Sequence, residues 1–483
     1  MSLQIFLQGK LLGIEEFLKS SVSEDASRDL LFAGHCRYAA LLSEVLPRAL
    51  LAELGLAKIL LGSSGGGQFL VVLPMEARPQ AEEFLSAAAG HIVELGGGAL
   101  KLAWAVTENL GEWSVVRRRL HEEMRRKRGT PAADLGPEAF QAFPEAASPG
   151  TDSLDQLAGQ LLGADSAGWS PESPGSVLPG AGKHVWALSS SAYADAIPIA
   201  RHAALEDGGT ARASLAKLGA RARGRSTWGV LLGDVDNFGV RMRRAQTIEE
   251  HIQLSVMYKQ FFAGELELAC SLPEFWQKVT ILYTGGDDFA VCGAWDALIP
   301  LAREIQRLFH RFCEENLKDF PGLDGKTITM ALSLAENAES PLESVFEDAV
   351  MRLDRAKSSD KDCISVLGRT LEWRQLAAAA ELRDTMQRVA SEIGSPSLFL
   401  REMSAFYRKD APARPAESPE PLPQRPWKIY GRLNRALGDT RDRVPQKLRA
   451  HLTNEMVAKG ATQVKLRPAG RVALEWTRLI AEE

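Results

Sequence analysis

ILYTGGDDFAVCGAW, residues 281–295, is the stretch of sequence that decides the fold. Two apolar runs flank a turn of two glycines and two aspartates, and this pattern predicts two strands joined by a tight β-hairpin. Asp287 and Asp288 stand next to each other with no basic residue beside them. Because adjacent like charges repel, either solvent or a cation has to accommodate this pair.

The segments around the hairpin alternate between strand and helix patterns. STWGVLLGDVD is a short apolar run that ends in acidic residues, which predicts a strand. The expected elements follow the order β-α-β-β-α-β over residues 226–236, 248–270, 279–283, 289–295, 296–316 and 327–336. A third helix at 344–359 and a strand at 363–368 come next. This order is the ferredoxin-like arrangement, which places the first strand beside the central hairpin.

That arrangement brings two acidic motifs together. The first strand ends with Asp234 and Asp236, and the hairpin turn carries Asp287 and Asp288. Carboxylates gathered at one sheet edge cannot all stay ionised without a cation, and hard oxygen ligands favour Mg²⁺ or Mn²⁺ held together with substrate phosphates. Two such ions can activate an attacking hydroxyl and neutralise a leaving pyrophosphate. The pattern therefore predicts a nucleotidyl-transfer site, and the alternative is an acidic turn exposed to solvent.

Lysines and glycines add to this predicted site. Lys357 and Lys361 lie four residues apart near the end of the third helix, so both can reach a triphosphate as point charges. Gly285 and Gly286 leave room for a nucleotide to approach the backbone. We therefore expect the hairpin turn and the end of this helix to line one nucleotide pocket.

The hairpin motif occurs twice in the chain. SGGGQFLV (64–71) aligns with TGGDDFAV (284–291), so that Asp287 is matched by a glycine and Asp288 by a glutamine. A glycine-lined turn without acids can still admit a nucleotide. The first copy is therefore interpreted as the partner half of a composite pocket, with a purely structural domain as the alternative. The pocket residues expected from the first copy are Gly65, Gly66, Gly67 and Gln68.

The repeat extends on both sides of the hairpin. Upstream, LQGKLLG (7–13) aligns with GDVDNFG (233–239), which pairs Asp234 with Gln8 and Asp236 with Lys10. Downstream, residues 99–108 resemble residues 327–336. Two copies of one fold are therefore expected, and the first has lost every metal-binding carboxylate.

Composition divides the chain into four parts. The predicted fold class is α+β, with two ferredoxin-like domains, a connector and a C-terminal helical domain. Residues rich in Pro, Gly, Ala and Ser after position 128 predict a loosely structured connector with at most short helices. The expected boundaries are 1–128, 129–220, 221–372 and 373–483.

Overall composition excludes several classes of protein. The formal charge of −5 argues against nucleic-acid binding through the overall field, although local basic patches remain possible partners for RNA. The five cysteines never form CxxC, so no zinc site is expected, and they are interpreted as small buried hydrophobic residues. No apolar run is long enough for a membrane span and no signal peptide is present, which makes a cytoplasmic protein the default.

The paired motifs carry a resemblance to a known family. SGGGQF in the first domain, and GDVDNFG with TGGDDFAVCGAWD in the second, resemble the large signature subunit of type III CRISPR–Cas effector complexes. The GAWD continuation and LFAGHCRYAALLSE (31–44) are more similar to the Csm type. The resemblance implies two palm domains, related to GGDEF and adenylyl cyclase domains, and covers most of the chain.

The family implies a target-RNA-activated synthase that joins ATP into cyclic oligoadenylate and releases pyrophosphate. Carried onto this sequence, the metals would be held by Asp234, Asp287 and Asp288, assisted by the Val235 carbonyl and Asp236. The implied nucleotide-binding residues are Asn237, Phe238, Ser255, Gly285, Gly286, Lys357 and Lys361. The implied cofactors are two Mg²⁺ or Mn²⁺ ions, without zinc.

The family also implies partners. These are the crRNA-binding backbone subunits, the small helical subunits, crRNA and target RNA. Association with a membrane is not implied. The basic clusters at 115–129, 221–225 and 241–244 are possible RNA contacts, with a solvated surface as the alternative. The C-terminal region resembles the part that docks on other subunits, through Arg401, Arg408, Lys428 and Arg432.

The sequence departs from the family in two ways. Many members begin with an HD nuclease domain, whereas no histidine here is followed by aspartate, so DNase activity is not expected. Many members also carry a four-cysteine zinc module where this chain has a cysteine-free stretch, which puts transmission of RNA binding to the site in doubt. The remaining alternatives are a non-catalytic scaffold subunit and a diguanylate-cyclase-like enzyme.

Overall fold

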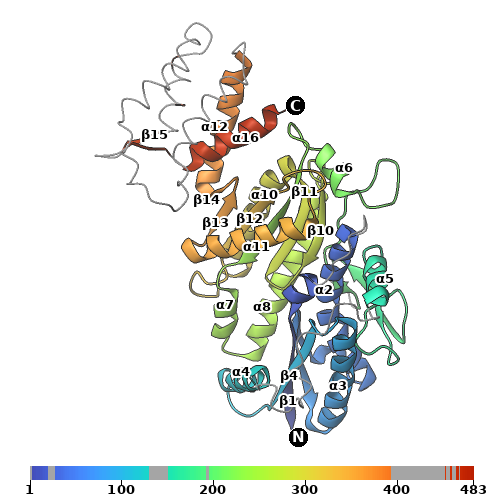
Figure 1. Ribbon diagram of the computed structural model, residues 1–483. Coiled ribbons are helices and arrows are strands. Elements are labelled where there is room, and N and C mark those ends of the chain that lie inside the picture. The colour runs from blue at the N-terminus through green and yellow to red at the C-terminus, as the bar shows by residue number, and fades with distance from the viewer. Residues whose placement is uncertain are drawn as a thin grey trace, which may run out of the picture.

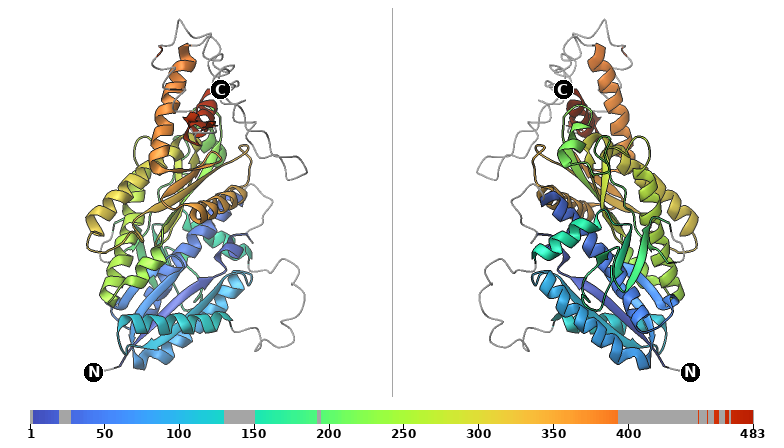
Figure 2. Two further views of the ribbon diagram at one scale, coloured as in Figure 1. Left: turned by 90° about the vertical axis from the view of Figure 1, so that its left-hand side faces the viewer. Right: turned by 90° about the vertical axis from the view of Figure 1, so that its right-hand side faces the viewer.

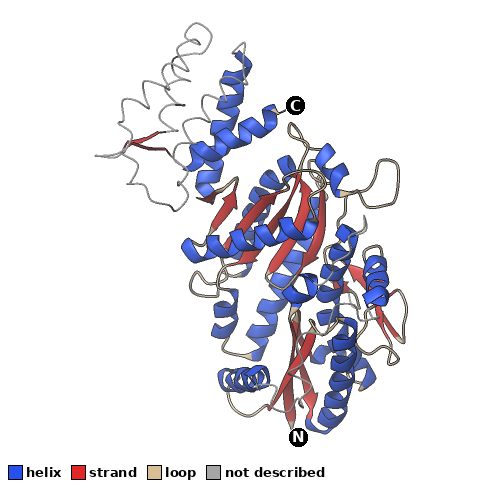
Figure 3. Ribbon diagram, in the orientation of Figure 1, coloured by secondary structure: helices blue, strands red, loops and turns tan. Residues whose placement is uncertain are grey.

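The computed structural model describes residues 3–19, 28–129, 151–191 and 195–392, and in the C-terminal part residues 446, 452, 457–459, 464–466 and 468–482. These residues form an α+β fold around two large sheets, one above the other in Figure 1. Helices cover the sheets, as Figure 3 shows. The predicted fold class is confirmed.

The first palm-like domain is built on a four-stranded antiparallel sheet in the order β2-β3-β1-β4. Its strands are β1 (Gln4–Leu12), β2 (Leu61–Gly65), β3 (Gln68–Pro74) and β4 (Lys101–Glu108). Its helices are α1 (Ile14–Lys19), α2 (Arg28–Glu53), α3 (Arg78–Leu95) and α4 (Trp113–Gly129), with 3₁₀ turns at Lys58–Leu60 and Met75–Ala77. Alternate residues of β1 face opposite sides: Ile5 shares a core with α2 and α3, and Phe6 packs on α4.

The second palm-like domain has a six-stranded sheet in the order β10-β11-β9-β12-β13-β14. Its strands are β9 (Trp228–Val235), β10 (Val279–Thr284), β11 (Asp288–Ala294), β12 (Ile328–Leu334), β13 (Cys363–Val366) and β14 (Arg369–Glu372). Its helices are α7 (Phe238–Arg244), α8 (Ile248–Gln260), a π-helical turn (Phe261–Glu265), α9 (Leu266–Cys270), α10 (Trp295–Asn316) and α11 (Leu342–Ser359). The predicted β-α-β-β-α-β order is confirmed, with α7 and β14 as additions.

The two domains share their hydrophobic cores. In β9, Leu231 packs in the core formed with α8 and α10, whereas Val230 and Leu232 pack in the core formed with α11 and with α2 of the first domain. Helix α2 therefore lies between the two sheets. The side views in Figure 2 show the first domain directly below the second.

The internal repeat is real, but its predicted register outside the hairpin is wrong by two residues. Gly9 lies opposite Phe69 across β1 and β3, just as Gly233 lies opposite Phe289 across β9 and β11. Lys10 therefore occupies the position of Asp234, which the sequence alignment assigned to Gln8. A shift of two leaves every side chain on the same face of the sheet, so the hydrophobic pattern did not reveal it.

Backbone hydrogen bonds confirm the corrected register. The Leu11 N–H donates to the Gly67 carbonyl at 2.7 Å, and the Val235 N–H donates to the Asp287 carbonyl at 2.9 Å. These two bonds are equivalent in the two domains, which agrees with the predicted pairing of Gly67 with Asp287. Both hairpins also carry a bulge at the same place, after Leu61 and after Ile281.

The connector contains more structure than predicted. Helix α5 (Thr151–Leu161), a four-stranded sheet and helix α6 (Leu215–Ala220) form it, at the right of Figure 1. The sheet order is β6-β5-β7-β8, with β5 (Ser166–Trp169), β6 (Leu178–Pro179), β7 (His184–Ser189) and β8 (Ile197–Pro198). The expectation of a loose segment with at most short helices is therefore wrong.

The C-terminal part contains two helices that pack together, α12 (Trp373–Glu392) and α16 (Pro468–Ala481), in segments that were predicted to be helical. A short hairpin of β15 (Val457–Lys459) and β16 (Val464–Leu466) was not predicted. The four basic residues proposed for subunit docking lie outside the described residues. None of the described helices is both long enough and apolar enough to cross a membrane. All five cysteines are buried, as predicted.

Candidate active site

The acidic residues meet where strand β9 ends beside the β10–β11 hairpin. Asp234 lies directly opposite Asp288 in the antiparallel ladder, and Asp287 is joined to β9 by the Val235 N–H. The turn is closed by the Gly285 N–H, which donates to the Asp288 carbonyl at 2.8 Å. A Cβ atom at Gly285 would lie 1.8 Å from an Asp288 carboxylate oxygen, so a side chain there would displace this carboxylate. The predicted convergence of these three aspartates is present.

Electrostatics make this cluster unusual. Burial, followed by the charge of Asp234, raises the pKa of Asp288 to about 6. Burial, followed by the charges of Asp288 and Asp234, also raises the pKa of Asp287 well above its usual value. Burial also raises the pKa of Asp234, and the charge of Lys357 makes this rise smaller. Three carboxylates are thus held together with less positive charge than they need, which favours binding of a cation.

The predicted lysines lie at the site but have different partners. Lys357 of α11 forms an ion pair with Asp234. Lys361 donates a hydrogen bond to the side-chain oxygen of Asn237, a residue in the left-handed conformation with φ 57°. Phe238 packs edge to face on Tyr258, with ring centroids 5.0 Å apart, and so belongs partly to the core. Of the two predicted lysines, Lys357 is therefore the one that pairs with an aspartate of the cluster.

Asp236 has a structural environment that the sequence did not indicate. It is buried, and its carboxylate accepts hydrogen bonds from the hydroxyls of Thr327 at 2.8 Å and Thr329 at 2.7 Å and from the Asp362 N–H at 2.9 Å. These partners hold the end of β9 against β12 and the turn after α11. The arrangement favours a positioning role for Asp236, although it was predicted as an assisting metal ligand.

Another residue that sequence reasoning missed is Tyr283. Its hydroxyl donates to a carboxylate oxygen of Asp288 at 3.2 Å. Its place immediately before TGGDD was a signal that could have been used. Ser255, predicted near the base or ribose, lies half-buried on α8.

The glycine turn of the first domain faces the acidic turn of the second. Gly65, Gly66 and Gly67 all have positive φ, at 110°, 59° and 72°. A Cβ atom at Gly66 would lie 3.3 Å from the backbone nitrogen of Gly286 and 3.9 Å from an Asp287 carboxylate oxygen. The two turns therefore approach backbone to backbone, which fits the predicted composite pocket. Gln68 is exposed, opposite Lys10 in the ladder.

The side chains at this site have the chemistry needed to bind a divalent metal ion. The carboxylates of Asp234, Asp287 and Asp288 are hard oxygen donors with raised pKa values, as expected for ligands of Mg²⁺ or Mn²⁺. Among the residues that the structure describes, no group of three or more acidic, histidine or cysteine side chains has the geometry of a metal site. The ammonium of Lys357 is the cation that contacts Asp234 in this arrangement.

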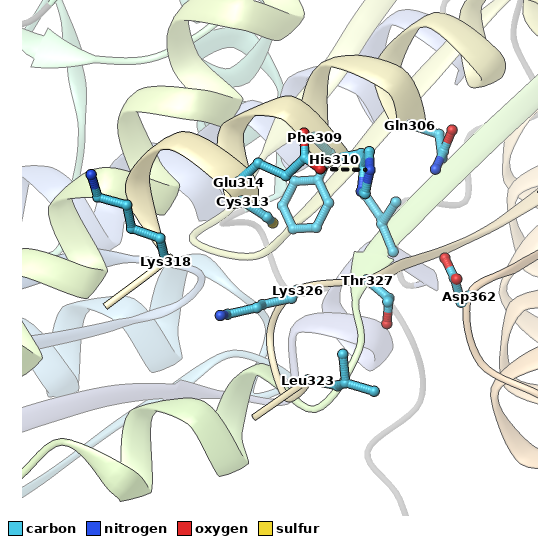
Figure 4. A pocket seen from close by; sticks show the side chains of 11 residues that line it. Gln306, Phe309, His310, Cys313, Glu314, Lys318, Leu323, Lys326, Thr327 and Asp362 are labelled. Carbon is cyan, nitrogen blue, oxygen red and sulfur yellow. Dashed lines mark ion pairs between the residues drawn. The ribbon is translucent and has the colours of Figure 1, made fainter. Parts of the chain in front are cut away.

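A separate pocket of about 550 Å³ lies between the second half of α10 and the loop before β12 (Figure 4). Phe309 and Cys313 of α10 line it, and the ion-paired His310 and Glu314 lie beside them. It does not include the three site aspartates. Thr327 and Asp362, which hold Asp236, form part of its wall.

Comparison with known proteins identifies the second domain. Residues 227–365 match the family model described as Cas10/Cmr2, second palm domain. This segment is therefore similar to the second palm domain of Cas10. A Cas10/Csm1 protein of subtype III-A from Thermococcus onnurineus, described as a single-strand-specific deoxyribonuclease, is 25% identical over 173 residues. That alignment covers 33% of this chain and 21% of the relative, so the chain matches about a fifth of the relative's length.

Solved structures extend the likeness to the whole Cas10-like chain. The crystal structure of Csm1 from T. onnurineus has a TM-score of 0.71 and 16% identity, and the match covers 100% of this chain and 70% of that one. A Csm1–Csm4 cassette in complex with AMPPNP has a TM-score of 0.68 and 18% identity, covering 99% of this chain and 70% of that one. The fold is therefore that of Csm-type Cas10, as the resemblance implied.

Proposed function

We propose that the chain is a nucleotidyltransferase that joins ATP into cyclic oligoadenylate, acting as the large subunit of a type III CRISPR complex. The observation that carries the proposal is the meeting of Asp234, Asp287 and Asp288 where β9 ends beside the hairpin turn, opposite the glycine turn of the first domain. Related support comes from Csm1–Csm4 cassettes of the same fold, solved with AMPPNP and with cA4.

Each site residue has a proposed task. Asp234, Asp287 and Asp288 would hold Mg²⁺ or Mn²⁺. When bound, such ions lower the pKa of an attacking 3′-hydroxyl and neutralise charge on the leaving pyrophosphate. The raised pKa values of the three carboxyls are the property that a bound cation would reverse.

The lysines and glycines would bind the nucleotide itself. Lys357 lies beside Asp234, so its ammonium can turn to a triphosphate when another cation takes its place at the carboxylate. Lys361 would add a second positive charge from the same helix end. The glycines of both turns expose backbone without side chains, so two nucleotides can approach each other between the domains. Asp236, Thr327 and Thr329 would keep the end of β9 in place.

The cellular setting follows the same proposal. We infer assembly with a Csm4-like subunit, because solved structures of this fold include Csm1–Csm4 cassettes. Activation by target RNA, and contacts with crRNA and the small subunits, are proposed on the family resemblance.

The test is a synthesis assay. The purified chain, alone and assembled with its subunits, guide RNA and matching target RNA, is incubated with labelled ATP and Mg²⁺ or Mn²⁺. We expect cyclic oligoadenylate in the assembled complex and none with Asp287→Ala/Asp288→Ala. Asp195→Ala, which changes an exposed carboxylate in the connector, is the control and should leave the product unchanged.

Two results would contradict the proposal. Absence of product from the assembled wild-type complex would favour a scaffold subunit. Formation of cyclic di-GMP from labelled GTP would favour a diguanylate-cyclase-like enzyme.

A further inference from the structure

A buried cluster of charged groups joins the two palm-like domains next to the candidate site. Glu44 belongs to α2 of the first domain, and Lys259 belongs to the last turn of α8 in the second. The Lys259 ammonium lies 2.6 Å from Glu44 Oε2 and 3.1 Å from the hydroxyl of Ser64. The same carboxylate oxygen also accepts hydrogen bonds from Arg48 at 2.7 Å and from Ser64 at 2.8 Å.

These charged groups are largely buried, which strengthens the interactions between them. The Glu44 side chain is 6% exposed and the Lys259 side chain 13%. Burial alone would raise the pKa of Glu44, but the charges of Lys259 and Arg48 outweigh it, so its pKa is lowered. Burial lowers the pKa of Lys259 to about 8, which leaves the ammonium protonated at neutral pH. Removing Lys259 takes one of two charged partners from the buried Glu44 carboxylate, and removing Glu44 takes the carboxylate partner from the buried Lys259 ammonium.

The position of the cluster relates it to the composite pocket. Ser64 is the residue immediately before Gly65, the first of the three glycines that face the acidic turn. A Cβ atom at Gly65 would lie 2.9 Å from Glu44 Oε1, so the carboxylate touches the glycine turn itself. In the second domain, Lys259 lies two residues before the π-helical turn Phe261–Glu265. Such turns are frequent at functional sites.

We propose that Glu44 and Lys259 are positioning residues that hold the glycine turn of the first domain in register with the acidic turn of the second. The pair reaches from α8 through Ser64 to Gly65, and the neighbouring Gly66 lies against Gly286. Two nucleotides bound on opposite turns can react only if these turns keep a fixed separation. This inference rests on the function proposed above, and it adds the residues that set the separation.

The test compares Lys259→Met with Lys259→Arg in the full chain. Hydrogen exchange of peptides covering residues 60–68 and 282–290 reports on the two turns without any need for catalysis. We expect exchange in both peptides to rise about tenfold in Lys259→Met and to stay near the wild-type rate in Lys259→Arg, which keeps the charge. In the assembled complex with saturating ATP, the rate per folded molecule should fall about tenfold or more in Lys259→Met.

The matched control is Lys58→Met, which breaks an exposed ion pair with Asp195 and should change neither readout. Because the loss of a charged partner from a buried group can unfold the chain, Glu44→Gln/Lys259→Met removes this pair as a whole and leaves Arg48 as the charge of the cluster. We expect its turns to exchange faster as well. Unchanged exchange in the turns, or a rise spread evenly over all peptides, would overturn the positioning role. A wild-type complex without product would instead refute the proposed function. The exchange measurement would then still decide whether Glu44 and Lys259 position the two turns.

Discussion

At the scale of single residues, the ammonium of Lys357 opposes the negative charge of all three site aspartates. Its ammonium pairs with Asp234 and lowers the pKa values of Asp287 and Asp288. We expect Lys357→Met to lower the rate of cyclic oligoadenylate synthesis about tenfold or more, because a charge-assisted contact is lost. The rate is measured at saturating ATP. Arg352→Met breaks a more exposed pair on the same helix and should have little effect; equal losses in the two variants would argue against a special role for Lys357.

Gly66 permits a second prediction at this scale. Its φ of 59° strains any other residue, and a Cβ atom there would meet the backbone of Gly286. We expect Gly66→Ala to cost about 1 kcal/mol in the free energy of unfolding and to abolish most of the synthesis. Gly97 has φ 56° and no atom within 4 Å of the added carbon, so Gly97→Ala isolates the backbone strain. If both variants lose the same activity, the close approach of the two turns is not what matters.

At the scale of elements, the same strand contact is used in both domains. A Cβ atom at Gly9 would lie 2.1 Å from the ring of Phe69, and one at Gly233 would lie 2.2 Å from the ring of Phe289. We expect Gly9→Ala and Gly233→Ala each to lower the free energy of unfolding by about 1–3 kcal/mol, measured by urea denaturation. Gly159→Ala in α5 has open space around it and should leave stability unchanged or slightly higher. A neutral effect at either strand glycine would mean that its aromatic neighbour moves freely.

The strands and helices of the second domain were predictable because their hydrophobic periods are long and regular. The register of β1 relative to β9 was not predictable, since a slip of two residues keeps the same face of β1 buried. The pairing of a glycine with a phenylalanine across the strands, Gly9 with Phe69 and Gly233 with Phe289, was the signal that would have corrected it. In the connector, β6 and β8 are two residues long, too short to show any period.

The candidate site divides in the same way. Asp234, Asp287 and Asp288 were predictable because a ferredoxin-like order brings the first strand beside the hairpin. The contacts of Asp236 with Thr327 and Thr329 depend on residues about 90 positions away, and no local pattern marks them. Local spacing can place residues within an element, but it does not say which side chains meet between elements.

At the scale of the whole molecule, the two domains meet through a second contact far along the chain from the glycine turns. The ring of His251 on α8 packs edge to face on Trp113 at the start of α4, with centroids 5.2 Å apart. Beside them, Arg117 of α4 donates to the Met242 carbonyl at 3.0 Å. Helix α4 is thereby attached to α7 and α8, so the first domain cannot move without breaking these contacts.

This contact should make stability depend on pH. Burial, and then the charge of Arg117, lowers the pKa of His251 from 6.5 to about 4. Between these values the unfolded chain binds a proton that the folded chain does not, so the contribution to stability is lost as the pH falls. We expect about 2 kcal/mol of loss from this residue between pH 7 and pH 5. His251→Phe keeps an aromatic ring against Trp113 without a titratable group, so its free energy of unfolding in urea should fall about 2 kcal/mol less over the same interval. Identical pH dependence in the two proteins would show that His251 is free to take up its proton in the folded chain, and that the domains do not close over it.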